Sequence, residues 1–330
     1  MIADEVLHAF RGRNVLVTGG TGLIGRQVVE LLCTAGAHVR IVSLDRLAIH
    51  PDAETHFGDL TDFDLCRSVT RDMDAVFHLA GIKGSVDVTT RKPASFFVPL
   101  LMMNTNVLEA CRLNAVPKVL YTSSIGAYPS REVFREAEAW DGPPMDEFPG
   151  WAKRMGELQV RAYHREHNAD GFVVVRLANV YGPGDNFDPA SAMVIPSLMA
   201  RIHAGEDPLV VWGDGSAVRD FVYSRDVAEG LLLALHHGTD GEVVNLGSGD
   251  GITIRALVEA LRDVVPFAFR FDATRPAGFP RRVMDITIAR DCLGYEPSTT
   301  LRAGLAATWS WFVANATVHE RKRDYFRASA

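Results

Sequence analysis

Three glycines near the start of the chain have the types and spacing to hold a pyrophosphate on backbone amides. They read G-x-x-G-x-x-G and stand between an apolar run at 14–18 and a segment with helical spacing. Glycine allows the tight turn after a strand, close approach of the backbone to a pyrophosphate, and close helix–strand packing. The N-terminus of the following helix would direct amide donors at the phosphates. The residues expected to form this dinucleotide site are Gly19, Gly22, Leu23, Ile24 and Gly25.

The type of dinucleotide depends on the end of the second predicted strand, at 38–44. Ser43 lies at that end, and Asp45 and Arg46 follow it. A carboxylate there binds ribose hydroxyls and repels the 2′-phosphate of NADP, whereas an arginine attracts that phosphate. The sequence therefore leaves NAD and NADP open as cofactors, with a small preference for NAD.

Two further loops are expected to contact the dinucleotide. Asp59 and Leu60 follow a short predicted strand, where Asp59 would accept from the adenine amine; the alternative is that Asp59 caps the next helix. Small residues at another strand end, where the dinucleotide would pass, are Leu79, Ala80 and Gly81.

The elements that must position these residues alternate between strand and helix. Strand-like apolar runs occur at 14–18, 38–44, 74–81, 118–124 and 171–183, and helical spacing occurs at 62–73, 95–115 and 151–168. This alternation predicts an α/β fold, a doubly wound parallel sheet of the Rossmann type with a smaller mixed α/β substrate lobe. We expect residues 1–178 to form the NAD(P)-binding domain, which also receives parts of 210–246. Residues 179–330 would form most of the substrate-binding lobe, interleaved with the first domain.

Composition limits the class of protein. The 330 residues are 47% hydrophobic and 23% charged, as in an ordinary globular protein, and the net charge of −7 disfavours a nucleic-acid partner. The four cysteines are scattered without a CxxC pair, so reduced thiols are expected and no metal site. The N-terminus lacks the apolar region of a secretory signal, and apolar runs such as 15–19 are of strand length. We therefore expect a cytoplasmic protein that does not interact with a membrane.

Motifs along nearly the whole chain resemble the extended short-chain dehydrogenase/reductase family. They are GGTGLIG at 19–25, GDL at 58–60, HLAG at 78–81, TSSIGAY at 122–128, WAKRMGE at 151–157 and RLANVYGPGDN at 176–186. The second half is most similar to the nucleotide-sugar branch and, within it, to the GDP-fucose synthase group. The motifs there are VIPSLM at 194–199, VVWGDGSAVRDFVYSRDVA at 210–228, PRRVMDIT at 280–287 and GLAATWSWF at 304–312.

The resemblance implies that Ser124 and Lys153 are catalytic. In the family a serine or threonine orients the sugar oxygen, and a lysine near a tyrosine phenol lowers its pKa so that it can exchange a proton. The lysine also donates to the nicotinamide ribose. Here the tyrosine position, four residues before Lys153, is Pro149, which has no proton to exchange. The nearest carboxylates are Asp146 and Glu147, and a solvated loop is the alternative role for both.

Two mechanisms known in the family are disfavoured by other departures. The 4,6-dehydratases follow the Ser/Thr with an Asp-Glu pair, but Ile125 and Gly126 stand at these positions. The GDP-fucose synthases epimerise with a cysteine and a histidine, and the matching positions are Ile125 and Met193. Neither elimination of water nor double epimerisation by those groups is therefore expected.

The remaining matched positions imply a site for the substrate. Ser124 would contact the sugar, Asn179 would reach the diphosphate, and Arg219 and Arg282 would neutralise phosphate with a charge that does not titrate. The alternative for Arg219 is a surface ion-pair network with the nearby acids Asp220 and Asp226.

These features lead to one main hypothesis and two alternatives. The chain would be an NAD(P)-dependent oxidoreductase or epimerase of a nucleotide sugar, GDP-sugars included, that acts by hydride transfer at a sugar carbon with a non-standard proton donor. The alternatives are a catalytically impaired relative that binds cofactor and nucleotide sugar, and a reductase of a non-sugar substrate. The helices near 95–115 and 151–168 pair across a two-fold axis in relatives, which implies a homodimer.

Overall fold

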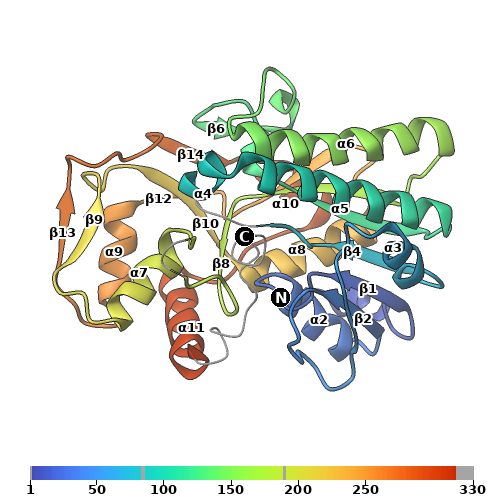
Figure 1. The fold of residues 1–330 in the computed structure, drawn as a ribbon, viewed down its shortest axis with the longest axis horizontal. Helices are drawn as coiled ribbons and strands as arrows, with labels where there is room; N and C mark the ends of the chain where they lie inside the picture. The colour runs from blue at the N-terminus through green and yellow to red at the C-terminus, as the bar shows by residue number, and fades with distance from the viewer. Residues whose placement is uncertain (1, 83–85, 189–190, 317–330) are drawn as a thin grey trace.

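A seven-stranded parallel sheet forms the centre of the molecule in the computed structural model, which describes residues 2–82, 86–188 and 191–316 (Figure 1). The strand order is β11-β7-β5-β4-β1-β2-β3, and every neighbouring pair is parallel. The strands are β1 (Asn14–Thr18), β2 (His38–Ser43), β3 (Glu54–Phe57), β4 (Ala75–His78), β5 (Lys118–Ser124), β7 (Phe172–Leu177) and β11 (Val243–Leu246). This is the doubly wound Rossmann order, in which the chain reverses direction of travel between β1 and β4. The predicted fold class is confirmed.

Helices cover both faces of this sheet. On one face lie α1 (Asp4–His8), α2 (Gly25–Thr34), α8 (Ser224–His237) and α10 (Thr287–Leu293), and on the other α3 (Phe63–Val69), α5 (Pro93–Leu113) and α6 (Glu147–His167). Successive strand residues point to opposite faces, so Val15 and Val17 join one apolar core while Leu16 joins the other. Burial on both faces explains why these strands read as continuous apolar runs.

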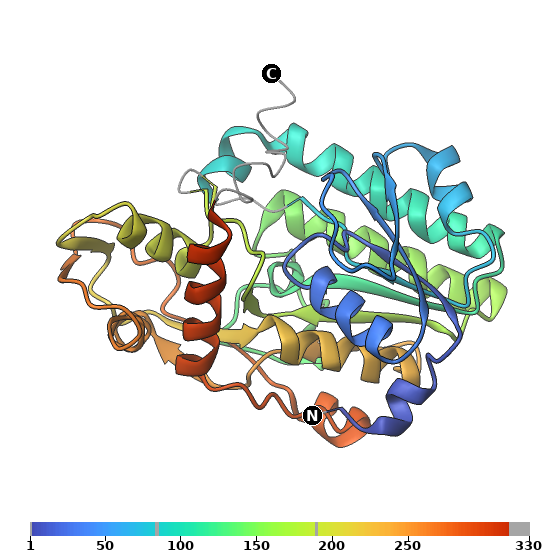
Figure 2. The same ribbon diagram turned by 90° about the horizontal axis from the view of Figure 1, so that it is seen from below.

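A smaller lobe lies beside the carboxyl ends of the large sheet, to the left in Figures 1 and 2. Its strands are β6 (Val133–Phe134), β8 (Asn179–Tyr181), β9 (Leu209–Trp212), β10 (Val218–Tyr223), β12 (Gly251–Thr253), β13 (Phe269–Asp272) and β14 (Arg281–Met284). Its helices are α7 (Val194–His203), α9 (Ile254–Arg262) and α11 (Leu301–Ala314). The chain exchanges strands between the two parts, because β6 pairs with β14 while β11 pairs with β7.

Three short helices complete the described chain. They are α4 (Val86–Arg91), η1 (Ile125–Ala127) and η2 (Glu136–Glu138). The turn η1 directly follows β5 and carries residues after the candidate serine, so its place decides what surrounds that serine.

Helix α5 is the one helix in the described part of the chain that is long and apolar enough to match a membrane span by length and composition. It packs against α3, α6 and β4, and Phe96, Leu100 and Val107 are buried in the core. Those contacts account for much of its apolar character.

Helix α6 begins at Glu147, four residues earlier than the sequence predicts. Pro149 lies in its first turn, where a backbone N–H would have no partner within the helix, so the proline removes no helical hydrogen bond. The predicted start at residue 151 was wrong, because a proline in the first turn is compatible with a helix that begins before it. Asp146 is consequently the residue that precedes the first turn.

Candidate active site

The glycine loop joins β1 to α2 at the carboxyl edge of the large sheet, and its geometry requires glycine. A Cβ on Gly25 would overlap the carbonyl oxygen of Gly19 and lie 2.7 Å from Gly20 Cα. Gly19 itself has φ +68°, and a Cβ there would lie 2.9 Å from Ala80 Cα. The loop is therefore compact and free of side chains where a helix N-terminus meets the sheet edge, which is the cradle that a pyrophosphate needs.

A chain of buried hydrogen bonds supports this loop from below. Thr18 Oγ1 accepts from the amides of Leu79 and Ala80 at 3.1 and 3.0 Å, so its single proton goes to His78 Nδ1 at 2.8 Å. Two of the three predicted dinucleotide-contact residues, Leu79 and Ala80, are thus anchored to β1. His78 has no exposed surface, and burial lowers the pKa of its imidazole to about 3. It is a neutral core histidine, as its apolar strand suggests.

The same chain of bonds continues to the candidate lysine. His78 Nε2 donates to Asn104 Oδ1 at 3.1 Å, and Asn104 Nδ2 donates to the Tyr121 hydroxyl at 3.0 Å. The Tyr121 hydroxyl then donates to the backbone carbonyl of Lys153 at 3.2 Å. Asn104 was not predicted as a site residue. Its sign in the sequence is an amide side chain directly after the apolar run 96–103 of α5, and the structure buries it completely.

The residues that follow β2 lie beside the glycine loop. Thr21 Oγ1 is 2.6 Å from Ser43 Oγ, and it donates to Asp45 Oδ2 at 3.3 Å. The Arg46 guanidinium lies 5.2 Å from the centre of the Phe57 ring. The carboxylate of Asp45 is therefore tied to the loop, whereas the arginine stacks over a neighbouring strand end.

Asp59 does not cap the helix that follows it, so that alternative was wrong. Its Oδ1 accepts from the amide of Thr61, while Asp62 caps α3 by accepting from Asp64 and Leu65. Leu60 is buried, with 6% of its surface exposed. These two residues form the loop after β3, at the same sheet edge as the glycine loop.

Ser124 and Lys153 meet this edge from β5 and α6. Ser124 ends β5, and its Oγ accepts from the amide of Gly126 at 3.1 Å. Lys153 Nζ donates to the Thr122 carbonyl at 2.8 Å and lies 3.9 Å from the place of a Cβ on Gly81. The structure thus brings the predicted lysine together with the end of β4. Burial lowers the pKa of Lys153 to about 8, and the negative charge of Glu157 opposes that shift.

No tyrosine hydroxyl in the described residues stands in for the missing phenol beside this lysine. The Tyr121 ring lies 5.2 Å from Lys153 Nζ, but its hydroxyl is bonded inside the protein and burial raises its pKa well above the usual value. The Tyr128 hydroxyl donates to Asn245 at 2.8 Å, and burial raises its pKa too. Both phenols are structural groups.

A buried ion pair lies one turn along α6 from the lysine. Arg176 donates to both carboxylate oxygens of Glu157, at 2.8 and 2.7 Å, and Glu157 also accepts from Ser123 Oγ. The arginine side chain has no exposed surface and the glutamate has 2%. The pair ties α6 to β5 and β7, the two strands beneath Lys153 and Ser124.

The arginines predicted to bind phosphate lie side by side on neighbouring strands. Arg219 of β10 is paired in register with Arg282 of β14, and each guanidinium is partly buried. Arg219 donates to the carbonyls of Val218 and Phe279, and Arg282 lies 4.0 Å from the centre of the Phe279 ring. The Nε atom of Arg282 is buried without a hydrogen-bond partner.

The proposed ion-pair network around Arg219 does not form. Asp220 accepts from Ser248 and Met284, and Asp226 accepts from Ser298 and Thr299. Asp220 thus joins β10 to the loop at Ser248 and to β14, and Asp226 ties the loop at 298–299 to α8. The two arginines keep a shared positive charge that an anion would neutralise.

Asn179 begins β8 and donates through Nδ2 to the carbonyl of Asp220 at 2.9 Å. This bond fastens β8 to β10 beside the arginine pair. In the structure the Asn179 amide therefore joins two strands. The predicted contact of Asn179 with a diphosphate stays a prediction.

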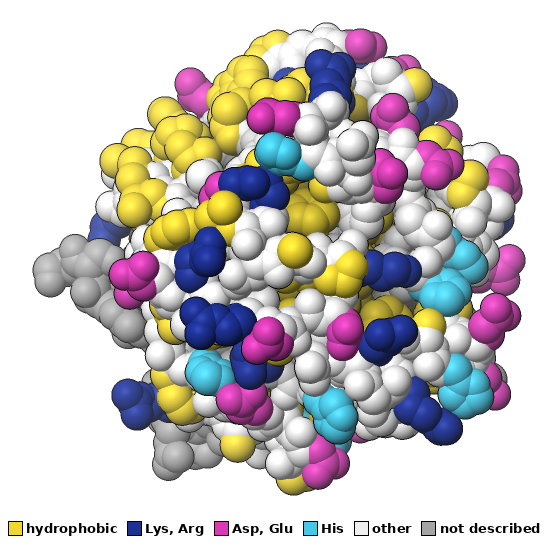
Figure 3. All heavy atoms as spheres, turned by 90° about the vertical axis from the view of Figure 1, so that its right-hand side faces the viewer, with side chains coloured by type: hydrophobic (Ala, Val, Ile, Leu, Met, Phe, Trp, Pro, Cys, Tyr) yellow, Lys and Arg dark blue, Asp and Glu magenta, His cyan; other side chains and the backbone are white. Residues whose placement is uncertain are grey.

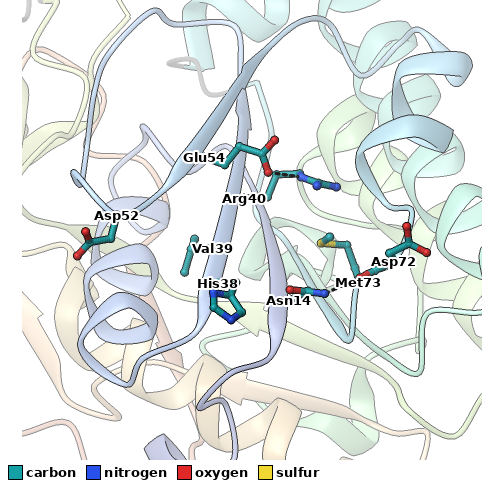
Figure 4. A pocket seen from close by; sticks show the side chains of 8 residues that line it. All are labelled: Asn14, His38, Val39, Arg40, Asp52, Glu54, Asp72 and Met73. Atoms are coloured by element: carbon teal, nitrogen blue, oxygen red, sulfur yellow. Dashed lines mark hydrogen bonds and ion pairs between the residues drawn. The ribbon is translucent and has the colours of Figure 1, made fainter.

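The pocket shown in Figure 4 belongs to the opposite edge of the sheet. It has a volume of about 320 Å³, and its lining includes Asn14, His38 and Glu54, the first residues of β1, β2 and β3. Ligands of doubly wound sheets bind outside the carboxyl ends of the strands, so this pocket is not the candidate site. No group of three metal-ligating side chains occurs among the described residues.

Comparison with known proteins gives results that agree with this geometry. Residues 15–247 match the model of the NAD dependent epimerase/dehydratase family. A probable GDP-L-fucose synthase 1 from Oryza sativa subsp. japonica is 30% identical over 318 residues, which cover 93% of this chain and 94% of that protein. A dTDP-4-dehydro-6-deoxy-D-allose reductase from a Streptomyces species is 31% identical, over 94% of this chain and 98% of that protein.

Solved structures share the whole architecture. The UDP-glucose 4-epimerase of Thermotoga maritima, solved with UDP-glucose, superposes with a TM-score of 0.80 at 30% identity. The match covers 92% of this chain and 99% of that one.

Proposed function

Because this chain belongs to the NAD dependent epimerase/dehydratase family, we propose that it moves hydride at a carbon of a nucleotide sugar, with GDP-sugars as the first candidates. The observation that carries the proposal is one shared edge of the sheet. It holds the glycine loop, the Lys153 ammonium and Ser124, with the Arg219–Arg282 pair on the adjoining lobe. The named relatives act on GDP- and dTDP-linked sugars, which favours a substrate with a diphosphate.

Each residue has a distinct task in this proposal. The backbone of residues 19–25 binds the pyrophosphate of NAD or NADP, which supplies the hydride acceptor when bound. The Lys153 ammonium donates to the ribose beside the nicotinamide, and Ser124 Oγ orients the reacting sugar oxygen. Arg219 and Arg282 hold the substrate diphosphate and thereby fix the sugar relative to the sheet edge.

A hydride-exchange assay tests the proposal. The chain is incubated with deuterium-labelled NADH or NADPH and a panel of GDP-, UDP- and dTDP-linked 4-keto and 4-hydroxy sugars, and label in the sugar is followed by mass spectrometry. We expect exchange with at least one member. Cofactor binding by calorimetry without exchange on any member would instead identify a binding protein, and exchange confined to non-sugar ketones would identify a different reductase.

Cofactor preference should follow Asp45, which we propose holds the adenosine ribose of NAD. In an Asp45→Ala variant we expect Kd for NAD⁺ to rise about tenfold, which is ~1.4 kcal/mol. Affinity for NADP⁺ should be equal or better, because a carboxylate that repels the 2′-phosphate is gone. Calorimetry measures both constants. The control is Arg46→Ala, which should weaken NADP⁺ alone. An unchanged ratio of the two affinities in the Asp45 variant would contradict the assignment.

We propose that two copies of the chain pair through α5 and α6. Both helices expose large apolar side chains, namely Val98, Met102 and Leu113 on α5 and Phe148, Trp151 and Leu158 on α6. Figure 3 shows apolar side chains gathered in one upper corner of the face that it displays, the side on which α5 and α6 run in Figure 1. Two-fold pairing of one apolar patch with itself removes it from water.

Light scattering should give a mass of twice 36.2 kDa for this assembly. Met102→Glu should reduce it to a single chain, because the carboxylate would be buried without a partner. Trp212→Glu, an equally drastic change at a side chain that is 61% exposed on β9, should leave the mass unchanged. A single-chain mass for the unaltered protein at micromolar concentration would rule out the dimer.

A further inference from the structure

The proposed reaction needs a group that exchanges a proton with the sugar oxygen, and Pro149 cannot do so. We propose that the carboxylate of Asp146 is this group. The inference rests on the proposed function and adds to it a named proton acceptor and donor. Its support comes from the position of Asp146 at the start of α6, from the turn after β5 and from the charge of Arg282 on the neighbouring lobe.

Asp146 is the residue immediately before the first turn of α6, the helix that carries the candidate lysine. Within the helix, residues 149, 150 and 153 follow the spacing that places side chains on one face. This face packs against the end of β5, because Lys153 donates to the Thr122 carbonyl and a Cβ on Gly150 would lie 2.6 Å from the Gly126 carbonyl. Asp146 meets the same turn directly, because its amide donates to the Gly126 carbonyl at 3.2 Å.

The carboxylate fills the space above Gly126. A Cβ on Gly126 would overlap Asp146 Oδ2 and would lie 3.0 Å from its carboxyl carbon. Ser124 Oγ bonds the amide of this same glycine. The absence of a side chain at 126 thus lets the carboxylate approach the turn that holds the candidate serine. Asp146 makes no capping hydrogen bond to α6, so its oxygens are not committed to the helix.

The surroundings keep the carboxylate able to hold a proton. Burial raises the pKa of Asp146, and the nearby positive charge of Arg282 works against that rise. Arg282 is the charged group that acts on it from β14, with Arg219 in register beside Arg282. On α6 the neighbouring acid Glu147 is exposed, and Lys153 Nζ is bonded to the Thr122 carbonyl. When a diphosphate pairs with Arg282, the opposing charge is neutralised and the pKa of the Asp146 carboxyl rises further.

In the proposed reaction Asp146 exchanges the proton with the sugar, and the nicotinamide cofactor exchanges the hydride. In the oxidative direction the sugar hydroxyl O–H breaks and its proton goes to the Asp146 carboxylate. The hydrogen on the same carbon leaves with its electron pair to the oxidised nicotinamide, so a carbonyl forms and the nicotinamide is reduced. In the reductive direction the protonated carboxyl returns the proton to the sugar oxygen as hydride arrives at the carbon.

The first test compares Asp146→Asn with Glu147→Gln. The two changes remove a carboxylate from adjacent positions, and Glu147 is exposed. On the sugar nucleotide that exchanges label with the unaltered chain, we expect Asp146→Asn to lower the hydride-transfer rate about 10²–10⁴-fold and Glu147→Gln to leave it within twofold. In the Asp146→Asn background, Pro149→Tyr should restore part of the rate by supplying a phenol near Lys153.

The second test needs no turnover and also distinguishes loss of the fold. Calorimetry of GDP or UDP binding in buffers of different ionisation enthalpy reports the protons taken up. The unaltered chain should take up more than Asp146→Asn, with similar Kd, and Glu147→Gln should match the unaltered chain. Equal proton uptake in all three overturns the inference, as does an undiminished rate in Asp146→Asn. Absence of exchange by the unaltered chain with every sugar nucleotide would instead count against the proposed function.

Discussion

Glu157→Gln should lower the free energy of unfolding by about 3–5 kcal/mol, because it leaves the buried guanidinium of Arg176 without a counter-charge. The glutamate oxygens accept from Arg176 and from Ser123, and an amide can satisfy only part of that demand. The Arg176 guanidinium also lies 4.2 Å from the centre of the Tyr128 ring, so a shift of its position would disturb the core beside β5. Urea unfolding followed by circular dichroism measures the effect as a lower midpoint at similar slope.

Glu54→Gln is the matched control for this prediction. It changes the same residue type in an arginine pair, Arg40–Glu54, whose side chains are 23% and 55% exposed. Its cost should lie below about 1 kcal/mol. Replacing both buried partners, by Glu157→Leu with Arg176→Met, should cost less than Glu157→Gln alone, since no unpaired charge remains. Equal costs for the two single variants would show that the buried pair does not stabilise the fold as argued.

Gly25→Ala should raise Kd for NAD⁺ or NADP⁺ by about 100-fold, or ~2.7 kcal/mol, without unfolding the chain. The added methyl would overlap the Gly19 carbonyl, and both are backbone positions that cannot move aside as a side chain could. The turn must therefore open, and its amides would no longer converge on a pyrophosphate. Calorimetry measures the affinity, and a thermal melt without cofactor measures the fold.

Two other glycine variants serve as comparisons, with smaller expected losses of cofactor affinity. Gly22→Ala should weaken cofactor binding less, because its methyl would lie 3.2 Å from the Gly19 carbonyl, which a small shift relieves. Gly12→Ala lies before β1 with open space around it, so it should not change the affinity for cofactor. Its φ of +67° strains an L side chain, so it should lower stability by about 1 kcal/mol. If Gly25→Ala bound cofactor as the unaltered chain does, the loop would not be the pyrophosphate site.

The large sheet was predictable because its signals are local. The run 14–18 is β1 to the residue, and 118–124 is β5 to the residue. Both strands lie inside the sheet, where burial on both faces favours the apolar runs that identify them, and the glycine loop follows β1. Lys153 was placed by its spacing within a motif, and the structure brings it beside Gly81, which another motif identified.

The smaller lobe was not predictable at the level of individual strands. Strand β9 pairs with β13, whose residues 269–272 lie sixty positions along the chain, and the two-residue strand β6 pairs with β14 from the opposite half. Such short strands exist because of their distant partners, and neither periodicity nor composition reveals that pairing. The polar contacts that follow from it, such as Asn179 with Asp220, were equally hidden.

At the candidate site, the surroundings of Asp146 could not be predicted from the sequence. The sequence indicates only that a carboxylate precedes Pro149. Its burial depends on α6 starting early, on the missing side chain at Gly126 and on the arrival of β14 with Arg282. These three conditions come from separate parts of the chain, so only the folded structure shows them together.

The hydrogen-bond chain beneath the glycine loop has a consequence for experiments over a range of acidity. With an imidazole pKa of about 3, His78 keeps one neutral tautomer from mildly acidic to alkaline solution, and every donor and acceptor along the chain keeps its direction. The hydrogen bonds that align β1, β4 and α6 therefore do not change over this pH range. Any rise and fall of turnover with acidity therefore reports the working groups at the sheet edge, such as Lys153 and Asp146, and not a rearrangement of the fold.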